Sequence, residues 1–207
     1  MVLFAYNSAM TAALILAAGR SSRMGRPKPL LRQIQSGHTF VGHLIRVAAA
    51  AGLSPIFVIG RSGDLELASE VVRSGGAFLV NPDAERGQVS SLLTGLAAAL
   101  SPELEAVMVM PVDVPLVSTG VLRTLLKAGE RPDAQIVRAA HRGIHGHPVL
   151  FKRAVFDELQ AADPDVGARG VVHADPSRVT DVEVGEAGVT LDLDTPADYL
   201  RAFGRRL

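Results

Sequence analysis

The 207-residue chain contains no cysteine and no tryptophan, and only 4% of its residues are aromatic. Without cysteine it can form no disulfide, no thiolate metal site and no cysteine nucleophile. So few aromatic side chains argue against a stacking platform for single-stranded nucleic acid. An excess of either charge is absent too, since 21 Lys and Arg balance 21 Asp and Glu. A neutral chain lacks the basic surface that usually holds nucleic-acid phosphates, so we expect no nucleic-acid partner.

Long apolar runs are also missing. No segment approaches the roughly 20 consecutive apolar residues that cross a bilayer, so we expect no membrane partner and a cytoplasmic location. The opening residues, MVLFAYNSAM, lack the basic region of a secretory signal. We therefore expect residues 1–11 to form a flexible N-terminal extension. Residues 12–207 have the length of one compact domain, and a chain that is 48% hydrophobic can bury a core.

Short apolar runs alternate with longer helical patterns along most of the chain. The runs are almost continuously apolar, which is typical of parallel strands covered on both faces. The predicted strands are 12–17, 55–59, 77–80, 106–110, 135–139, 146–151 and 179–184. The predicted helices are 41–51, 65–74, 90–100, 118–128, 153–161 and one from about residue 196.

This alternation predicts an α/β fold, a three-layer αβα sandwich around a mostly parallel sheet. Ligands of such sheets bind in the crevice beyond the carboxyl ends of the strands. The loops that follow the predicted strands are therefore the segments in which to look for functional residues.

A glycine-rich segment, LAAGRSSRMGRPK over residues 16–28, directly follows the first predicted strand. Gly19 and Gly25 allow a tight turn and bring backbone N–H groups close to a ligand. The segment also carries two serine hydroxyls and four cations, at Ser21, Ser22, Arg20, Arg23, Arg26 and Lys28. Any one of these residues fits a solvated basic turn, but together they favour a polyphosphate site. The segment matches neither the Walker loop nor the dinucleotide-binding fingerprint.

Aspartates follow later strands and could hold a metal ion. Asp113, in PVDVP, comes directly after the predicted strand 106–110. A carboxylate there is well placed for Mg²⁺, which needs one or two carboxylates beside phosphate oxygens. Capping of the next helix is the alternative role for Asp113. Asp192 and Asp194, in LDLDTP, form a second acidic pair, and Asp194 could instead cap the helix that follows it.

The string LAAGRSSRMGRPKPLL closely resembles the signature of the MobA-like NTP transferases. Within that family the chain is most similar to the molybdenum cofactor cytidylyltransferases. Further segments follow in the family's order, namely NPDAERGQVSSLLTGL, PVDVPLV, GHPVLF and DLDTPADY. The resemblance implies a Rossmann-like fold of the nucleotide-diphospho-sugar transferase type, a nucleoside triphosphate substrate and Mg²⁺ as cofactor.

The resemblance also assigns roles to individual residues. It implies that Lys28, Arg23 and Asp113 are catalytic, and that Asp113 and Asp194 bind the metal. On the acceptor side it points to His147 and Arg169, although a lone histidine is often structural. Ser91 could alternatively cap a helix. The implied nucleotide-binding residues are Leu16, Ala17, Ala18, Gly19, Arg20, Ser21, Arg23, Lys28, Asn81 and Ser91.

The implied reaction is the transfer of CMP from CTP to the phosphate of a molybdopterin-type cofactor, with release of pyrophosphate. The expected partners are the nucleoside triphosphate, a phosphorylated pterin and a molybdoenzyme that receives the product. Two alternatives stay open. One is a guanylyl- or sugar-phosphate nucleotidyltransferase on the same scaffold, and the other is a non-catalytic factor that delivers the cofactor.

Overall fold

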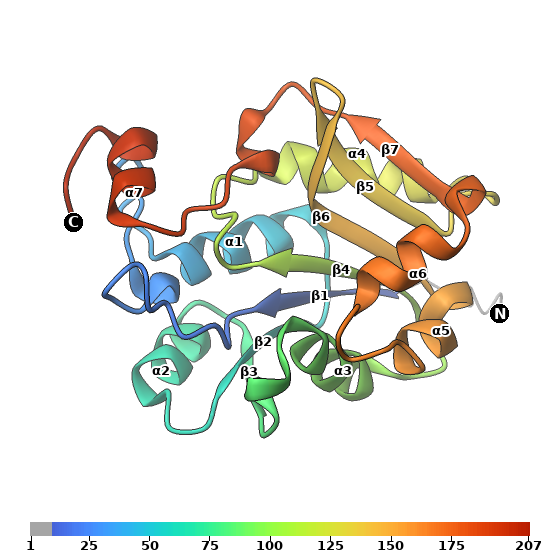
Figure 1. Cartoon of the computed structure of the whole chain (residues 1–207), viewed down its shortest axis with the longest axis horizontal. Coiled ribbons are helices and arrows are strands. Elements are labelled where there is room, and N and C mark those ends of the chain that lie inside the picture. The colour runs from blue at the N-terminus through green and yellow to red at the C-terminus, as the bar shows by residue number, and fades with distance from the viewer. Residues whose placement is uncertain (1–9) are drawn as a thin grey trace, which may run out of the picture.

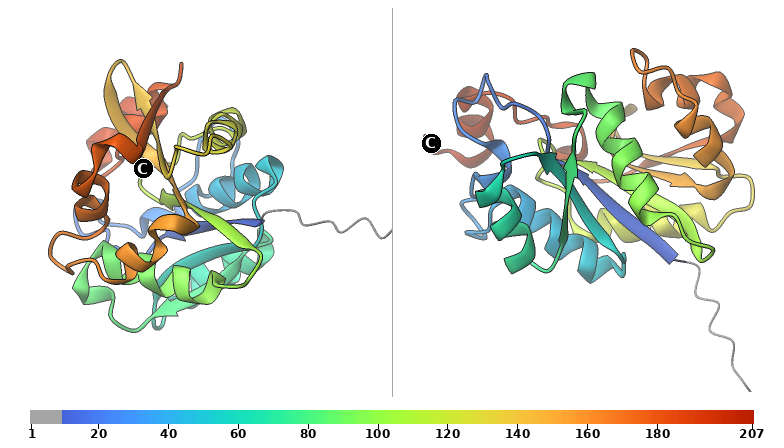
Figure 2. Two further views of the ribbon diagram at one scale, coloured as in Figure 1. Left: turned by 90° about the vertical axis from the view of Figure 1, so that its right-hand side faces the viewer. Right: turned by 90° about the horizontal axis from the view of Figure 1, so that it is seen from below.

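The computed structural model describes residues 10–207, which form a seven-stranded sheet between two layers of helices (Figures 1 and 2). The strand order is β3-β2-β1-β4-β6-β5-β7, and only β6 runs antiparallel to its neighbours. The strands are β1 (Met10–Leu16), β2 (Ile56–Arg61), β3 (Ala77–Asn81), β4 (Leu104–Pro111), β5 (Ile136–His141), β6 (Ile144–Lys152) and β7 (Val179–Glu183). The predicted fold class, a mostly parallel αβα sandwich, is confirmed.

Helices cover both faces of this sheet, as the two views of Figure 2 show. One layer contains α1 (Phe40–Ala51), α2 (Leu65–Arg73), α4 (Thr119–Gly129) and α7 (Pro196–Phe203). The other contains α3 (Gln88–Ala99), α5 (Phe156–Gln160) and α6 (Ala168–Ala174). None of the helices within residues 10–207 is long and apolar enough to span a membrane.

The central strand β1 shows why the apolar runs are continuous. Ala13 and Ile15 pack into the core beneath α1 and α4, whereas Leu14 and Leu16 pack beneath α3. Successive side chains of a strand point to opposite faces, and here both faces are buried. Every residue of β1 from 12 to 16 is therefore at most 7% exposed.

Two parts of the sequence prediction need correction. Met10 and Thr11, assigned to the flexible extension, belong to β1 and pair with β4; residues 1–9 of that extension lie outside the described residues. The segment around Arg169, for which no helix was predicted, begins helix α6. Gly167 and Gly170 give this segment poor helix propensity, but Val171 is 5% exposed and packs against the core beneath α3. Burial of an apolar side chain thus outweighs poor local helix propensity.

The topology fixes where a ligand can bind. β1 and β4 lie side by side at the centre of the sheet and run parallel, so their carboxyl ends meet at one edge (Figure 1). From β1 the chain continues outward to β2 and β3, and from β4 the sheet continues to β6 on the other side. Such a switch point leaves a crevice between the two loops that follow the central strands. The glycine-rich loop and Asp113 both lie there.

Candidate active site

The glycine-rich loop is folded around Ser21. The carbonyl of Ser21 accepts hydrogen bonds from the N–H groups of Met24 and Gly25, at 3.0 and 3.2 Å. Its hydroxyl accepts one from the N–H of Lys28 at 3.0 Å. Ser21 has φ = 51°, in the left-handed region that non-glycine residues seldom adopt. Its own three hydrogen bonds hold it in this conformation and define the shape of the loop.

Several backbone donors of this loop are free. Within residues 10–207, the N–H groups of Ala18, Gly19 and Arg20 donate no hydrogen bond. Gly19 and Arg20 are exposed. Unpaired N–H groups after a parallel strand, beside several cations, are what a phosphate group requires.

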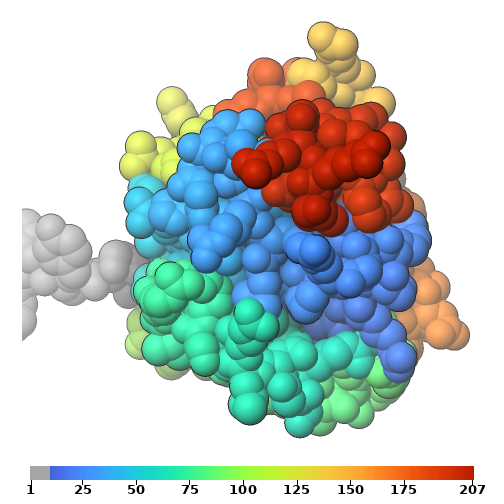
Figure 3. Space-filling view, turned by 90° about the vertical axis from the view of Figure 1, so that its left-hand side faces the viewer, coloured from blue at the N-terminus to red at the C-terminus, as the bar shows by residue number. Residues whose placement is uncertain are grey.

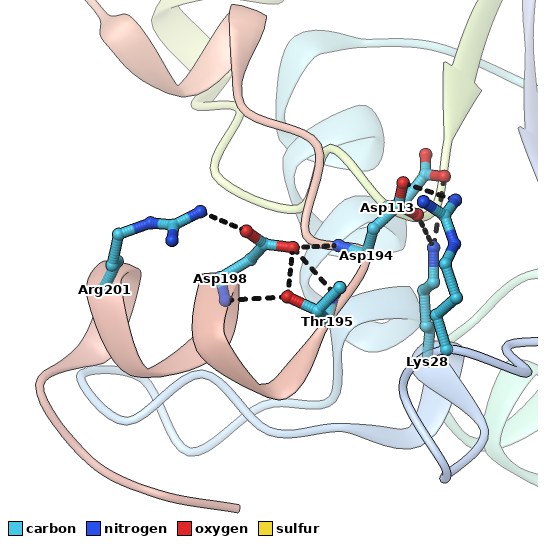
Figure 4. A network of polar contacts seen from close by, with 7 residues as sticks. Lys28, Asp113, Asp194, Thr195, Asp198 and Arg201 are labelled. Atoms are coloured by element: carbon cyan, nitrogen blue, oxygen red, sulfur yellow. Dashed lines mark hydrogen bonds and ion pairs between the residues drawn. The ribbon is translucent and has the colours of Figure 1, made fainter.

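Lys28 lies between two aspartates that come from distant parts of the chain (Figure 4). Its Nζ is 3.4 Å from Oδ2 of Asp113, and it also donates to Oδ1 of Asp194. Arg23 donates to the other oxygen of Asp194 at 2.7 Å. The Lys28 side chain is 11% exposed, against 34% for Asp113 and 27% for Asp194. The structure thus brings together four sequence-predicted site residues as one ion-pair cluster.

Backbone contacts set the position of both aspartates. The N–H of Val112 donates to the carbonyl of Leu16 at 3.0 Å, which extends the pairing of β4 and β1 up to the loop. The carbonyl of Asp113 accepts a hydrogen bond from the N–H of Leu193 at 2.7 Å, which places the segment of Asp194 beside it. The two carboxylates therefore meet beside Lys28 at the carboxyl edge of the sheet, although 80 residues of chain lie between them.

Neither aspartate is a helix cap, which was the alternative role for each. Ser118 caps α4, and Thr195 caps α7. The carboxylate of Asp198 accepts the N–H groups of Asp194 and Thr195 at 3.1 and 2.7 Å, completing a capping box (Figure 4). The side chain of Asp194 is consequently free to face Lys28.

The two neighbouring aspartates 192 and 194 differ in their electrostatics. The hydrogen bond from Lys28 lowers the pKa of Asp194, with further lowering by the charges of Lys28 and Arg23. Burial raises the pKa of Asp192, and the charges of Asp113 and Asp194 raise it further. The charge of Lys28 lowers the pKa of Asp192 only in part, so the repulsion from the other two carboxylates outweighs its attraction.

The donor set at this position fits a divalent cation. Residues 10–207 contain no preformed cluster of three or more His, Asp or Glu side chains arranged as metal ligands. Mg²⁺ and Mn²⁺ prefer oxygen ligands, however, and usually take only one or two carboxylates together with phosphate oxygens and water. Asp113 and Asp194 could supply these carboxylates once a phosphate chain attracts the Lys28 ammonium.

The residues predicted for the nucleobase lie together but face the protein interior. The Asn81 amide donates to the hydroxyls of Ser90 and Ser91 at 2.8 and 3.0 Å, and its oxygen accepts the N–H of Asp83 at 2.9 Å. Asn81 and Ser91 are 2% and 3% exposed. They join the end of β3 to the first turn of α3, so in this structure they shape the neighbouring loop. A direct contact with a base stays a prediction.

The two residues predicted for the acceptor side, His147 and Arg169, interact through their charges. Burial lowers the pKa of His147; the charge of Asp113 raises it and that of Arg169 lowers it, so both charges act on the imidazole. Nδ1 of His147 is buried without a hydrogen-bond partner among the described residues. The Arg169 side chain is on the first turn of α6 and is exposed.

Sequence reasoning missed a second ion-pair cluster on the other side of the loop. Glu85 joins Arg20 and Arg61, with N–O distances of 2.7 and 2.5 Å. Arg61 is the last residue of β2, so the rule that ligands gather at strand carboxyl ends could have pointed to it. Glu85 carried no comparable signal, because it lies in a short 3₁₀ turn after β3.

A cavity of about 870 Å³ adjoins this second cluster. It lies between the glycine-rich loop and residues 63–67 at the start of α2, and Arg20 and Arg61 line it. Figure 3 looks onto this face, where the loop (blue) lies between α7 (red) and the α2 region (green-blue). A second hollow of about 430 Å³ lies between the loop and α7. The glycine-rich loop thus separates the two hollows and contributes residues to both.

Comparison with known proteins agrees with this architecture. The model of the MobA-like NTP transferase domain matches residues 13–179. The molybdenum cofactor cytidylyltransferase of Escherichia coli is 30% identical over 93% of this chain and 95% of its own. The purine catabolism protein PucB of Bacillus subtilis is 25% identical over 90% of this chain and 92% of its own.

A solved structure is similar throughout. Rv0371c of Mycobacterium tuberculosis superimposes with a TM-score of 0.80 at 31% identity, covering 95% of this chain and 98% of that protein. A second structure of Rv0371c is a complex with manganese, with a TM-score of 0.75 at 27% identity over 94% of this chain and 98% of that one. The glycine-rich loop, the strand order and these likenesses lead to one conclusion: the chain belongs to the MobA-like NTP transferase family and is a nucleotidyltransferase.

Proposed function

We propose that the protein transfers CMP from CTP to the terminal phosphate of a molybdopterin-type cofactor and releases pyrophosphate, with Mg²⁺ as cofactor. The observation that carries the proposal is the ammonium of Lys28 between the carboxylates of Asp113 and Asp194, directly beside the free N–H groups of the glycine-rich loop. The name of the E. coli relative supports the choice of base and acceptor.

In this reaction a phosphate oxygen of the acceptor attacks the α-phosphorus of CTP. The bond from that phosphorus to the oxygen bridging to the β-phosphate breaks, and pyrophosphate leaves with the electron pair. A phosphate acceptor is already ionised at neutral pH, so no general base is required. The protein has to align the two oxygens and neutralise charge.

The chain's own residues can perform this work. The free N–H groups of Gly19 and Arg20 would bind phosphate oxygens, and Lys28 and Arg23 would neutralise the triphosphate. Asp113 and Asp194 would hold Mg²⁺, which supplies further charge neutralisation at the phosphates when bound. His147, on which the charges of Asp113 and Arg169 act, and Arg169 itself would contact the acceptor phosphate.

The base and the acceptor can be tested together. Purified protein is incubated with each of the four nucleoside triphosphates, Mg²⁺ and molybdopterin or a sugar phosphate, and pyrophosphate release is measured. We expect release with CTP and molybdopterin. Pyrophosphate release with GTP instead of CTP would indicate a guanylyltransferase. Release with a sugar phosphate but not with molybdopterin would indicate a sugar-phosphate nucleotidyltransferase. Tight CTP binding without pyrophosphate release from any pair would indicate a delivery factor.

A molybdoenzyme partner and a cytoplasmic location belong to the same proposal, because the product is a cofactor that another enzyme must receive. Co-purification of tagged protein with molybdenum-containing enzymes from its native cells is the measurement that tests the partner.

A further inference from the structure

Arg61 makes a contact with the glycine-rich loop that the phosphate-binding role does not explain. Its Nε donates to the carbonyl oxygen of Ala18 at 2.7 Å. This is the only hydrogen bond to that oxygen among residues 10–207. Arg61 lies at the carboxyl end of β2, beside β1, so its guanidinium approaches the loop from the β2 side.

Arg61 is itself fixed at both ends. Its backbone N–H donates to the Asp64 carboxylate at 3.0 Å, and its Nη1 donates to Glu85 at 2.5 Å. The side chain is only 25% exposed. A guanidinium held by a carboxylate on one side presents its remaining N–H in a defined direction, because the group is planar.

The contact determines where the next amide points. The Ala18–Gly19 peptide is planar and trans, so its N–H points opposite to its C=O. With the carbonyl of Ala18 directed to Arg61 and β2, the Gly19 N–H is directed to the other side of β1. That side carries β4 and, beyond its end, Asp113.

Among residues 10–207, the contact from Arg61 is the one hydrogen bond that this peptide makes, because the Gly19 N–H donates none. The space beside Gly19 is open, since a Cβ added there would meet nothing within 4 Å. Glycine has the widest choice of backbone conformations, and a rotation of the Ala18–Gly19 peptide would replace the N–H with a carbonyl oxygen on the crevice side. A carbonyl there would repel phosphate.

We propose that Arg61 is a positioning residue that directs the Gly19 N–H into the crevice to bind a phosphate of the substrate. Arg61 acts through the backbone of the loop and touches no reacting atom. The inference rests on the proposed function in one respect, that the ligand is a polyphosphate.

The test uses Mg²⁺-tripolyphosphate as the probe, which carries no base or acceptor. Binding to wild type, Arg61→Gln and Arg26→Gln is measured by calorimetry at low and at high salt. Arg26 is an exposed cation of the same loop, and it lines the cavity of about 870 Å³ that Arg61 also lines. Its variant therefore removes a positive charge without releasing the carbonyl of Ala18. Arg61→Gln should lose the charge-assisted hydrogen bond from the Gly19 N–H to phosphate. Its affinity for tripolyphosphate should therefore fall about tenfold to a hundredfold at both salt concentrations. The smaller loss in Arg26→Gln should fade at high salt.

A second measurement follows the Gly19 amide directly by NMR. We expect its proton resonance to move downfield when wild type or Arg26→Gln binds tripolyphosphate, and to stay unmoved in Arg61→Gln. This readout would not follow from a loss of charge or of stability alone.

The outcomes separate this inference from the proposed function. The role of Arg61 would be overturned if both arginine variants lost the same affinity, if high salt erased both losses, and if the Gly19 resonance of Arg61→Gln moved downfield on binding as it does in wild type. No binding of tripolyphosphate to wild type would overturn both. Binding and shifts as expected, but no pyrophosphate release from any triphosphate and acceptor, would overturn the proposed function and leave the role of Arg61 intact.

Discussion

The two sides of the glycine-rich loop carry ion-pair clusters of opposite design. On the aspartate side, one partly buried ammonium, that of Lys28, lies between the carboxylates of Asp113 and Asp194. On the arginine side, one exposed carboxylate, that of Glu85, lies between two guanidinium groups. In the proposed mechanism a substrate rearranges the charges of the first cluster, whereas in the proposed role of Arg61 the second cluster fixes the backbone of the loop. The comparison suggests a division of labour within one loop: its aspartate side would bind the substrate, and its arginine side would hold the backbone in place.

The largest effect should come from Asp113 on the aspartate side. Asp113→Asn removes the charge but keeps the shape, and we expect a loss in kcat/KM of about a hundredfold or more. The far-ultraviolet circular dichroism should be unchanged, because the side chain is one-third exposed. The matched control is Asp133→Asn, since within residues 10–207 the exposed Asp133 forms an ion pair with Arg131 alone. Near-wild-type rates for Asp113→Asn would remove this residue from the proposed mechanism.

A smaller effect is expected from Lys28→Met. The variant lacks the cation for the triphosphate and leaves two carboxylates facing each other, so CTP affinity should fall about tenfold to a hundredfold. Equilibrium binding of CTP with Mg²⁺ measures it. Lys127→Met, at an exposed position in the last turn of α4, is the control and should bind as wild type does. Equal affinities of wild type and Lys28→Met would mean that the Lys28 ammonium stays with the aspartates when the nucleotide binds.

The neighbouring aspartates should change stability in opposite directions with pH. The lowered pKa of Asp194 contributes stability above its ordinary value of 3.8, and this contribution is lost as the pH falls through the lowered pKa. The raised pKa of Asp192 has the opposite effect. Ionisation of Asp192 destabilises the fold as the pH rises above 3.8, and the full destabilisation is reached above the raised pKa. At pH 7, without divalent cations, Asp194→Asn should therefore lower the melting temperature and Asp192→Asn should raise it.

Both changes should vanish in acid, where the wild-type carboxyls are protonated as well. Thermal unfolding of the three proteins at pH 7 and at acidic pH is the measurement. A stabilised Asp194→Asn at pH 7 would show that the ion pairs with Lys28 and Arg23 do not stabilise the fold.

The smallest effect on stability should come from the arginine side. The hydrogen bonds from Arg20 and Arg61 lower the pKa of Glu85, so its contribution exists above its ordinary pKa and is lost in acid. The group is exposed, however, and exposed ion pairs contribute little. Glu85→Gln should change the melting temperature less than either Asp194→Asn or Asp192→Asn, and high salt should remove the difference. A larger change in melting temperature for Glu85→Gln than for Asp194→Asn would show that the arginine side, and not the aspartate side, contributes more to stability.

The sequence predicted all seven strands and six of the seven helices of the described chain, because both depend on local patterns. Continuous apolar runs formed buried strands, and Ser118 begins a helix because its hydroxyl accepts a nearby N–H. Helix α6 was not predicted, because its stability comes from the packing of the buried Val171 against distant residues and not from a local sequence pattern.

The candidate site divides in the same way. The loop that follows β1, and the aspartate that follows β4, could be recognised from residue types and their position after strands. That Lys28 meets both Asp113 and Asp194, 85 and 166 residues away, could not, because chain topology alone brings them to one edge of the sheet. The burial of Asn81 against Ser91 and the contact of Arg61 with Ala18 have the same origin.

Taken by itself, the amino-acid sequence determined the layered fold and the chemistry of the loop, because apolar periodicity, glycine and charge act within a few residues. Only the tertiary structure decided which charges are paired, which side chains are buried and which way the loop amides face. These properties depend on contacts between strands that are neighbours in space and far apart along the chain.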